Sequence, residues 1–314
     1  MAKTRVVFVH RPGQVNFGSK IMRCDQLSQI AAQHLNDTYS FDVLTPPRRR
    51  FAVRQRRFAK GLQGAIVIFL KGTARVFDPN ALDILRKSVR GLCIDHLDAP
   101  IGEEFLDLAD VHIAASRRGE TLLRQKIASM SSLRSTPVVA HLGHHADPRL
   151  SPARRDRKDI NIGYFGNRAN TYLPPTVSQK VVAYEYGKDV EFSSVLSQMQ
   201  ETQMHYAVRG PTARPAVENR IAKPFTKGFN AAAVGANVLV NRQVDDAEFY
   251  LGNDYPFLIN GLDQNSLREG VEKAQDLYRS PDWQRGLDIM KDVRERCSAR
   301  AIAQELDDVL STFS

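Results

Sequence analysis

Residues 220–242 read RIAKPFTKGFNAAAVGANVLVNR, and this stretch decides the fold of the second half of the chain. Pro224 suits the first turn of a helix, where its missing N–H leaves no hydrogen bond unmade. Phe229 and the alanines after it continue a helix predicted near 224–234, Gly235 ends that helix, and NVLVN follows as a buried strand. A helix that passes through a glycine into an all-apolar strand is typical of a parallel α/β sheet.

Two lysines and a threonine crowd the start of this predicted helix. Lys223 and Lys227 are four residues apart, and Thr226 lies between them. The free N–H groups and the dipole of a helix favour an anion at its N-terminus, and two ammonium groups and a hydroxyl strengthen that preference. The pattern predicts a diphosphate site, with an ordinary solvated helix start as the alternative.

A glycine turn lies upstream, in INIGYFGNR at 160–168. The apolar run predicts a strand that opens a second domain, and Gly163 and Gly166 would let the backbone approach a phosphate. Arg168 follows the turn and is a candidate partner for the same phosphate. Two glycines beside a strand are common, so this segment alone is weak evidence for a phosphate site. It supports the site because it precedes residues 220–242.

The first 145 residues alternate short apolar runs with helical patterns, as a parallel sheet covered on both faces requires. Ligands bind such sheets at the C-terminal ends of the strands. We expect strands at 5–10, 40–47, 65–70, 91–94, 110–115 and 137–140, and the polar residues at their ends are His10, Lys71, Asp95, His96, Asp98, Ser116 and His141–His145.

Residues 230–239, NAAAVGANVL, resemble the donor-binding helix of GT-B glycosyltransferases, which reads like E-A-M-A-x-G-x-P-V-I. The K-P-x-T-K stretch at 223–227 resembles branches of that superfamily in which a lysine replaces the usual acidic residue near the nucleotide sugar. Asn230 stands where the family has its second glutamate. The resemblance covers roughly 160–311, and over the first 145 residues it is only architectural.

The resemblance implies an α/β fold of two Rossmann-like domains facing a cleft. The expected parts are an acceptor-side domain at 1–145, a linker at 146–159, a nucleotide-sugar-binding domain at 160–298, and a helix at 299–314 that packs back on the first domain. The donor is expected to contact Lys223, Thr226, Lys227, Gly166, Arg168, Asn230 and Glu248, with Gly18 close to its phosphates.

No metal or other cofactor is expected beside the nucleotide-sugar substrate. The resemblance implies that cationic side chains offset the charge of the leaving diphosphate, and the chain contains no D-x-D metal-binding signature. His141, His144 and His145 are not predicted to form a metal site, because adjacent histidines do not easily share one ion.

The catalytic candidates follow the strand at 91–94. An inverting transfer needs a base for the acceptor hydroxyl, and His96 with Asp95 or Asp98 would supply a base with an orienting carboxylate. The alternative is a loop whose aspartates cap the next turn. Arg23, on the helix predicted at 19–35, is either a second phosphate partner or a surface arginine.

The chain has 314 residues and a formal net charge of +9, which indicates an anionic partner. Seven basic residues and no acidic one lie in 48–60, interleaved with Phe51, Val53 and Phe58. This segment is either a solvated face or a patch for anionic membrane headgroups or an acidic acceptor. Nucleic acid is not expected as a partner, because no nucleic-acid-binding motif accompanies the charge.

Cysteine usage and hydropathy indicate a cytoplasmic protein that at most touches the inner face of a membrane. The three cysteines are far apart and form no C-x-x-C motif. No apolar stretch approaches the roughly 18 residues that a membrane-spanning helix needs.

The principal hypothesis is a hexosyltransferase-like enzyme that moves a sugar from a nucleotide sugar to a glycan, lipid-linked or small acceptor, as in polysaccharide biosynthesis. The alternative is a catalytically inactive protein of the same architecture that binds a nucleotide or glycan. An oxidoreductase or kinase ranks last, since no G-x-G-x-x-G follows the first strand and no G-x-x-x-x-G-K-[ST] occurs.

Overall fold

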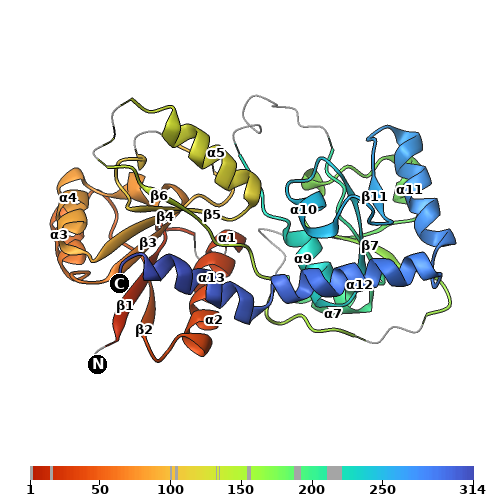
Figure 1. Cartoon of the computed structure of the whole chain (residues 1–314), viewed down its shortest axis with the longest axis horizontal. Coiled ribbons are helices and arrows are strands. Elements are labelled where there is room, and N and C mark those ends of the chain that lie inside the picture. The colour runs from red at the N-terminus through yellow and green to blue at the C-terminus, as the bar shows by residue number, and fades with distance from the viewer. Residues whose placement is uncertain are drawn as a thin grey trace. The chain divides into compact units, whose positions relative to one another are not determined.

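The computed structural model divides into two compact units (Figure 1). The first contains the described residues up to His144 together with 221–224 and 299–314, and the second contains the described residues of 145–210 and 225–298. The described residues are 3–14, 17–99, 101–102, 105–131, 133, 135–153, 157–186, 192–210 and 221–314.

The stretch 146–159, predicted as a linker, is counted with the second unit. Leu150 lies in the core of that unit, and the backbone N–H of Asp147 donates to Asn230 Oδ1 at 3.2 Å. These buried attachments, which a polar composition does not reveal, tie the stretch to the second unit. Residues 154–156 lie outside the described residues.

The first unit is built on a six-stranded sheet in the order β2-β1-β3-β4-β5-β6, and its strands pair in parallel as the sequence predicts. Its elements are β1 (Thr4–Val9), α1 (Gly18–Lys20), η1 (Ile21–Gln26), α2 (Leu27–His34), β2 (Tyr39–Leu44), α3 (Ala52–Lys60), β3 (Ile66–Leu70), η2 (Lys71–Val76), α4 (Pro79–Ser88), β4 (Gly91–Asp95), β5 (Val111–Ala114), α5 (Arg117–Ala128), β6 (Val138–His141) and α13 (Ala299–Ser311).

Both faces of this sheet are buried because successive β1 residues point to opposite sides. Val6 and Phe8 pack in one cluster with residues of α2 and α13, including Leu306. Val7 and Val9 pack in another cluster with residues of α3 and α4. The C-terminal helix α13 is therefore part of the first unit's core, although the second unit precedes it in the chain.

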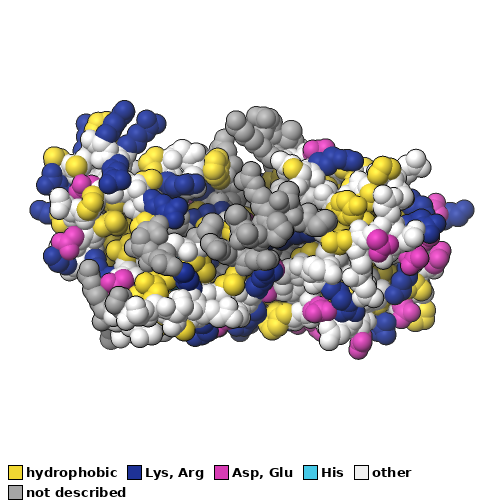
Figure 2. All heavy atoms as spheres, turned by 90° about the horizontal axis from the view of Figure 1, so that it is seen from above, with side chains coloured by type: hydrophobic (Ala, Val, Ile, Leu, Met, Phe, Trp, Pro, Cys, Tyr) yellow, Lys and Arg dark blue, Asp and Glu magenta, His cyan; other side chains and the backbone are white. Residues whose placement is uncertain are grey.

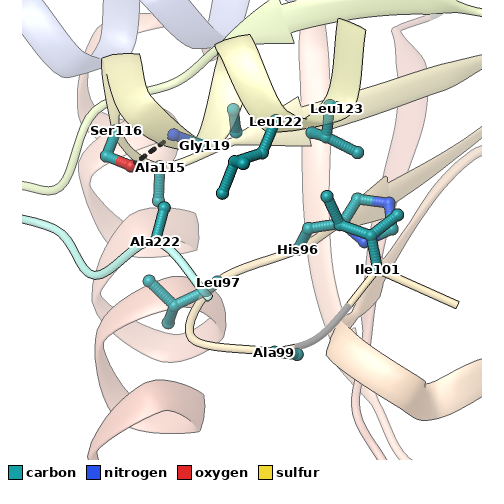
Figure 3. A pocket seen from close by; sticks show the side chains of 11 residues that line it. His96, Leu97, Ala99, Ile101, Ala115, Ser116, Gly119, Leu122, Leu123 and Ala222 are labelled. Atoms are coloured by element: carbon teal, nitrogen blue, oxygen red, sulfur yellow. Dashed lines mark hydrogen bonds between the residues drawn. The ribbon is translucent and has the colours of Figure 1, made fainter. Parts of the chain in front are cut away.

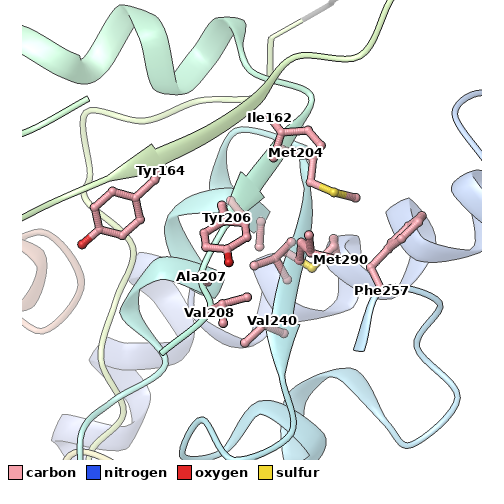
Figure 4. Packing of buried hydrophobic residues seen from close by; sticks show 14 of the residues in the cluster. Ile162, Tyr164, Met204, Tyr206, Ala207, Val208, Val240, Phe257 and Met290 are labelled. Atoms are coloured by element: carbon pink, nitrogen blue, oxygen red, sulfur yellow. The ribbon is translucent and has the colours of Figure 1, made fainter. Parts of the chain in front are cut away.

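The second unit contains a five-stranded sheet in the order β11-β10-β9-β7-β8, again with parallel pairs. Its buried core includes Tyr164, Tyr206, Val240 and Phe257 (Figure 4). The elements are β7 (Ile162–Phe165), η4 (Arg168–Asn170), α6 (Pro175–Ser178), β8 (Val182–Tyr184), η5 (Phe192–Val195), α7 (Leu196–Glu201), β9 (Met204–Tyr206), α9 (Thr226–Ala233), β10 (Asn237–Asn241), α10 (Ala247–Leu251), β11 (Leu258–Ile259), α11 (Gln264–Asp276) and α12 (Pro281–Arg296).

The mixed α/β class with two parallel Rossmann-like sheets confirms the predicted fold class. In the predicted helix 19–35, residues Ile21–Gln26 are π-helical. This wider turn carries Arg23, whose side chain is wholly buried rather than exposed on the surface.

Arg23 binds the ends of two strands of the first sheet. Its Nε donates to Asp95 Oδ2 at 2.7 Å, and its two Nη atoms donate to the carbonyl oxygens of Gly143 at 2.6 Å and Leu142 at 3.1 Å. Asp95 ends β4, and Leu142 and Gly143 follow β6. One guanidinium therefore fixes both strand ends against the π-helical turn.

We expect Asp95→Asn to lower the free energy of unfolding by about 3–5 kcal/mol, because it leaves the buried Arg23 charge without its counterion. Urea denaturation measures the change.

Arg5 and Asp42 provide a matched control, since their Nε–Oδ2 distance is also 2.7 Å but their side chains are 41% and 46% exposed. Asp42→Asn should cost less than about 1 kcal/mol. Equal losses in the two variants would contradict the structural role given to the buried pair.

Candidate functional site

Two of the predicted catalytic residues, Asp95 and His96 at the end of β4, have different partners in the structure. Asp95 is 2% exposed and faces Arg23, and its Oδ1 accepts the backbone N–H of Leu97 at 3.1 Å. His96 bonds to His112 instead. The expected partnership of His96 with Asp95 is wrong, because successive residues at a strand end point to opposite faces.

His96 and His112 form a hydrogen-bonded chain that ends on the backbone. His112 Nε2 lies 3.0 Å from the Leu106 carbonyl, which can only accept, so His112 donates from Nε2. His112 Nδ1 therefore accepts from His96 Nε2 at 2.8 Å, and His96 Nδ1 keeps a lone pair. Burial and the neighbouring His112 lower the pKa of His96 to about 3, so the ring stays neutral at neutral pH.

Asp98 is the candidate that reaches solvent. It is exposed and has a φ of 50°, and Lys71 at the end of the neighbouring strand has a φ of 51°. Positive φ in residues other than glycine is strained and concentrates at functional sites. Burial lowers the pKa of Lys71, and the negative charge of Asp98 opposes this shift. The two side chains thus interact at the C-terminal edge of the first sheet.

A small pocket lies beside His96 (Figure 3). Its wall is mostly apolar and includes Leu97, Leu123 and Ala222, and the Ser116 hydroxyl accepts the Gly119 N–H at 3.0 Å at its rim. The cavity volume is about 10 Å³, room for roughly one water molecule. This pocket is too small for a sugar, so an acceptor would have to bind over the sheet edge.

Gly18 begins α1, and a Cβ placed there would meet no atom within 4 Å. The structure therefore gives no steric reason for glycine at 18, and its closeness to the donor phosphates stays a prediction. Arg23 is neither a phosphate partner nor a surface arginine, because it is buried against Asp95.

The acid sensitivity of folding should depend on His96. Its pKa is about 3 when folded and about 6.5 when unfolded, so only the unfolded chain gains this proton as the pH falls below 6.5. Stability therefore declines with falling pH, by at most about 1.4 kcal/mol per unit from this group. His96→Gln should flatten the slope of unfolding free energy against pH between about 6.5 and 4.

His34→Gln is the control, because His34 lies exposed on α2. Denaturant midpoints measured at half-unit pH steps give the slopes. If His96→Gln keeps the wild-type slope, the assignment of a neutral His96 ring in the folded protein is wrong.

In the second unit, the structure brings Gly166 and Lys227 together around Tyr164. Lys227 Nζ lies 5.2 Å from the centre of the Tyr164 ring. Gly166 follows β7 with a φ of 141°, and a Cβ there would lie 3.1 Å from Tyr164 Oη and 3.2 Å from Lys227 Nζ. A side chain at 166 would therefore crowd both the phenol and the ammonium, so glycine is needed there on steric grounds as well as for its φ. Tyr164 donates to the Asn167 carbonyl at 2.6 Å, which orients its ring.

Arg209 joins this group and was not predicted. It follows β9, and its backbone N–H donates to Asn241 Oδ1 at 2.9 Å. Burial raises the pKa of Tyr164, and the Arg209 charge acts in the opposite direction, so Arg209 lies within electrostatic range of that ring. The strand-end rule applied to the first domain would have found Arg209, which directly follows the apolar run at 204–208.

The helix that carries Lys227 starts later than the sequence predicts. α9 begins at Thr226 with Phe225 as its N-cap residue, and no side chain caps it. Lys223 and Pro224 precede the helix, in the segment grouped with the first unit. Proline disfavours helical backbone in the residue before it, which explains why Lys223 is outside the helix. Thr226 and Lys227 remain in the first turn.

The remaining predicted donor contacts have partners within the protein or face solvent. Asn230 is 5% exposed and accepts from the Asp147 backbone, and Glu248 pairs with Arg242 at 2.6 Å. Arg168 is exposed in the short helix η4. Asn230 therefore fixes the 145–153 stretch, and its contact with a nucleotide stays a prediction, as do those of Glu248 and Arg168.

The residues that the structure describes offer neither a cluster of metal-ligating side chains nor a membrane-spanning helix. They contain no group of at least three His, Cys, Asp or Glu side chains placed to hold a metal ion. No helix among them combines the length and the hydropathy needed to cross a bilayer.

The fold matches those of solved glycosyltransferases. A glycosyltransferase from Rickettsia africae has 8% sequence identity and a TM-score of 0.63, with 100% of this chain and 99% of that chain covered. Anabaena HepE, solved in complex with UDP, has 11% identity and a TM-score of 0.61, with 98% and 100% covered. The lipopolysaccharide outer core galactosyltransferase WaaB has 9% identity and a TM-score of 0.57, with 98% and 99% covered.

No protein-family model matches the chain, and no curated protein matches it. At these identities the structural matches establish the two-unit GT-B fold. They leave the chemistry to be argued from the side chains.

Proposed function

We propose that this protein is a glycosyltransferase that takes a hexose-like sugar from a nucleotide sugar, with the diphosphate against Lys227, Gly166 and Arg209. The observation that carries the proposal is the Lys227 ammonium, which lies over the Tyr164 ring and next to Gly166, where a Cβ would stand 3.2 Å from it. It occupies the first turn of α9, where free N–H groups attract an anion.

The structural neighbours support a nucleotide donor and suggest a first probe. HepE was solved in complex with UDP, and other neighbours include a UDP-forming trehalose-phosphate synthase. Because the identities are low, the base and the sugar must be measured, and UDP is the first nucleotide to test.

In the proposed reaction the acceptor oxygen bonds to the anomeric carbon of the donor while that carbon's bond to the diphosphate oxygen breaks. The cations of Lys227 and Arg209 stabilise the charge that develops on the leaving diphosphate, and we propose that no metal is required. Asp98 accepts the proton of the acceptor hydroxyl in an inverting transfer. Asp95 and His96 act as positioning residues, because Asp95 Oδ2 accepts from Arg23 and His96 Nε2 donates to His112.

Lys227→Ala should weaken UDP binding by about 1.5–3 kcal/mol, roughly ten- to a hundred-fold in Kd. Thermal unfolding against UDP concentration measures the Kd. Release of free sugar or UDP from UDP-sugars then tests turnover, and Asp98→Asn should lower the rate while leaving the UDP Kd unchanged.

Lys180→Ala is the matched control in the second unit. Lys180 pairs with Glu272 and precedes β8, at the opposite edge of the sheet. Its variant should bind UDP like the wild type. A search with GDP and ADP follows if UDP fails, and no stabilisation by any of the three would reject the donor site.

The second candidate function is a nucleotide-binding protein without turnover. It is favoured by the buried Asn230 at the position of the family's second glutamate. This alternative is supported if a nucleotide binds to the wild type and not to Lys227→Ala, while no sugar conjugate of that nucleotide is turned over.

We also propose that residues 48–60 contact an anionic membrane surface where a lipid-linked acceptor would be met. In α3, Val53 is 72% exposed, and Arg50 and Arg54 lie over the Phe51 ring at 4.9 and 5.1 Å. Figure 2 draws Lys and Arg side chains with hydrophobic ones among them on the left, the side where Figure 1 draws α3. Exposed apolar groups ringed by arginine suit anionic headgroups, each nearby charge contributing about 1 kcal/mol.

Val53→Ser should reduce co-sedimentation with phosphatidylglycerol vesicles several-fold, because the valine no longer enters the headgroup boundary. The control is Val138→Ser, since Val138 is 46% exposed at the start of β6, away from α3. Equal binding by both variants and the wild type would reject this surface.

A further inference from the structure

Positive charge is gathered on one side of the C-terminal edge of the first sheet. The strand order β2-β1-β3-β4 places the residues after these strands side by side. Arg48–Arg50 follow β2, Arg11 follows β1 and Lys71 follows β3, while Asp98 follows β4. We call Arg11, Arg48–Arg50 and Lys71 the cationic edge. No acidic residue stands among them, and Asp98 borders them.

Lys71 is the residue of this edge that lies next to Asp98 in the strand order. It is half-buried, and its positive φ of 51° holds it in a strained conformation. The charges of Asp98, Asp95 and Arg11 all act on it. Among the residues that the structure describes, its ammonium makes no hydrogen bond or ion pair. A partly desolvated ammonium held in this way favours an external anion.

The loops of the cationic edge are held in place by buried polar contacts. His10 Nε2 and Thr45 Oγ1 lie 2.9 Å apart and join the ends of β1 and β2. Gln55, which is 0% exposed, donates to the carbonyl oxygens of Pro47 at 2.6 Å and Val76 at 2.8 Å, and accepts the Asp78 N–H at 2.6 Å. One buried amide thus fixes the loop after β2 against the segment after β3. The edge is preorganised, which reduces the cost of ordering it around a ligand.

We propose that the cationic edge binds a phosphate group of the acceptor, with Lys71 and Arg11 on its oxygens. This deepens the proposed function and rests on it, because it names the chemical class of the acceptor. In the orientation of the Gln14 amide that satisfies its hydrogen bonds, the Gln14 oxygen accepts from Arg11 Nε at 2.9 Å and from Arg11 Nη2 at 3.1 Å, which holds the guanidinium in place. The remaining N–H groups on its two Nη atoms can donate to phosphate oxygens, and the Lys71 ammonium adds a point charge. Asp98 then lies one strand away from the phosphate, where a hydroxyl of the same acceptor would reach it.

Inorganic phosphate is the probe. Thermal unfolding is followed against phosphate concentration, with sodium chloride at matched ionic strength as the blank. The Kd for phosphate should rise roughly ten-fold in Lys71→Gln and in Arg11→Gln, the loss of about one charged hydrogen bond. Lys87→Gln is the control, because Lys87 pairs with Asp83 near the end of α4, just before β4 begins at the opposite edge.

The same variants separate this proposal from the donor site. Phosphate also resembles part of a nucleotide, so the titration is repeated in Lys227→Ala, where the Lys71-dependent binding should persist. UDP binding should be unchanged in Lys71→Gln. If phosphate binding depends on Lys227 and not on Lys71, the acceptor proposal fails while the donor proposal stands.

Vesicle binding distinguishes the two sources of an acceptor phosphate. A phosphate carried on a lipid should make Lys71→Gln bind phosphatidylglycerol vesicles less than the wild type does, with phosphatidylcholine vesicles as the blank. A soluble phosphorylated acceptor should leave vesicle binding unchanged while the phosphate Kd still rises. Unchanged phosphate Kd values and unchanged vesicle binding in both edge variants overturn the proposal.

Discussion

The buried guanidinium of Arg23 is the constraint on which the first unit's functional edge depends. A charge with no exposed surface must be neutralised and hydrogen-bonded, and Arg23 meets this need with Asp95 and two backbone carbonyls. These partners end β4 and follow β6, so satisfying one side chain fixes two distant strand ends. Glu305 of α13 adds to this, since it accepts the Gly143 N–H at 2.6 Å. The C-terminal helix is thereby tied to the same edge.

Both units place their candidate chemistry at the C-terminal edge of a parallel sheet, but with different charges. The first unit has cations over β2, β1 and β3 with an acid after β4. In the second, Lys227 lies over the Tyr164 ring, the charge of Arg209 acts on that ring, and Gly166 beside them carries no side chain to crowd the ammonium. An anionic acceptor and a diphosphate donor are the ligands that these two arrangements favour on electrostatic grounds.

The sequence predicts elements whose apolar runs are long, such as β1, β3 and β10. It does not predict the helix at 52–60 with assurance, because its buried residues are only Gln55 and Ala59. The strands β8 and β11 are also missed, since they have three and two residues and carry no readable pattern.

In the candidate site too, some residues can be recognised from local sequence and others cannot. Lys227 and Gly166 are recognisable from local sequence because their roles follow from a helix start and a glycine turn. Which side Asp95 and His96 face, or that Gln55 bridges two loops, depends on contacts between distant segments. A single sequence does not reveal such contacts, and for that reason Arg23 was expected to be either a phosphate partner or a surface arginine.

Hydrogen–deuterium exchange with and without nucleotide is the decisive measurement for a donor site in the second unit. With UDP, GDP or ADP in excess, we expect slower exchange at the amides of 166–170, 207–210 and 226–229 for at least one nucleotide. The groove beside β11, lined by Asn260 and Lys273, should be unaffected. Protection confined to that groove, or no protection by any nucleotide, would contradict a donor site at the C-terminal edge of the second sheet.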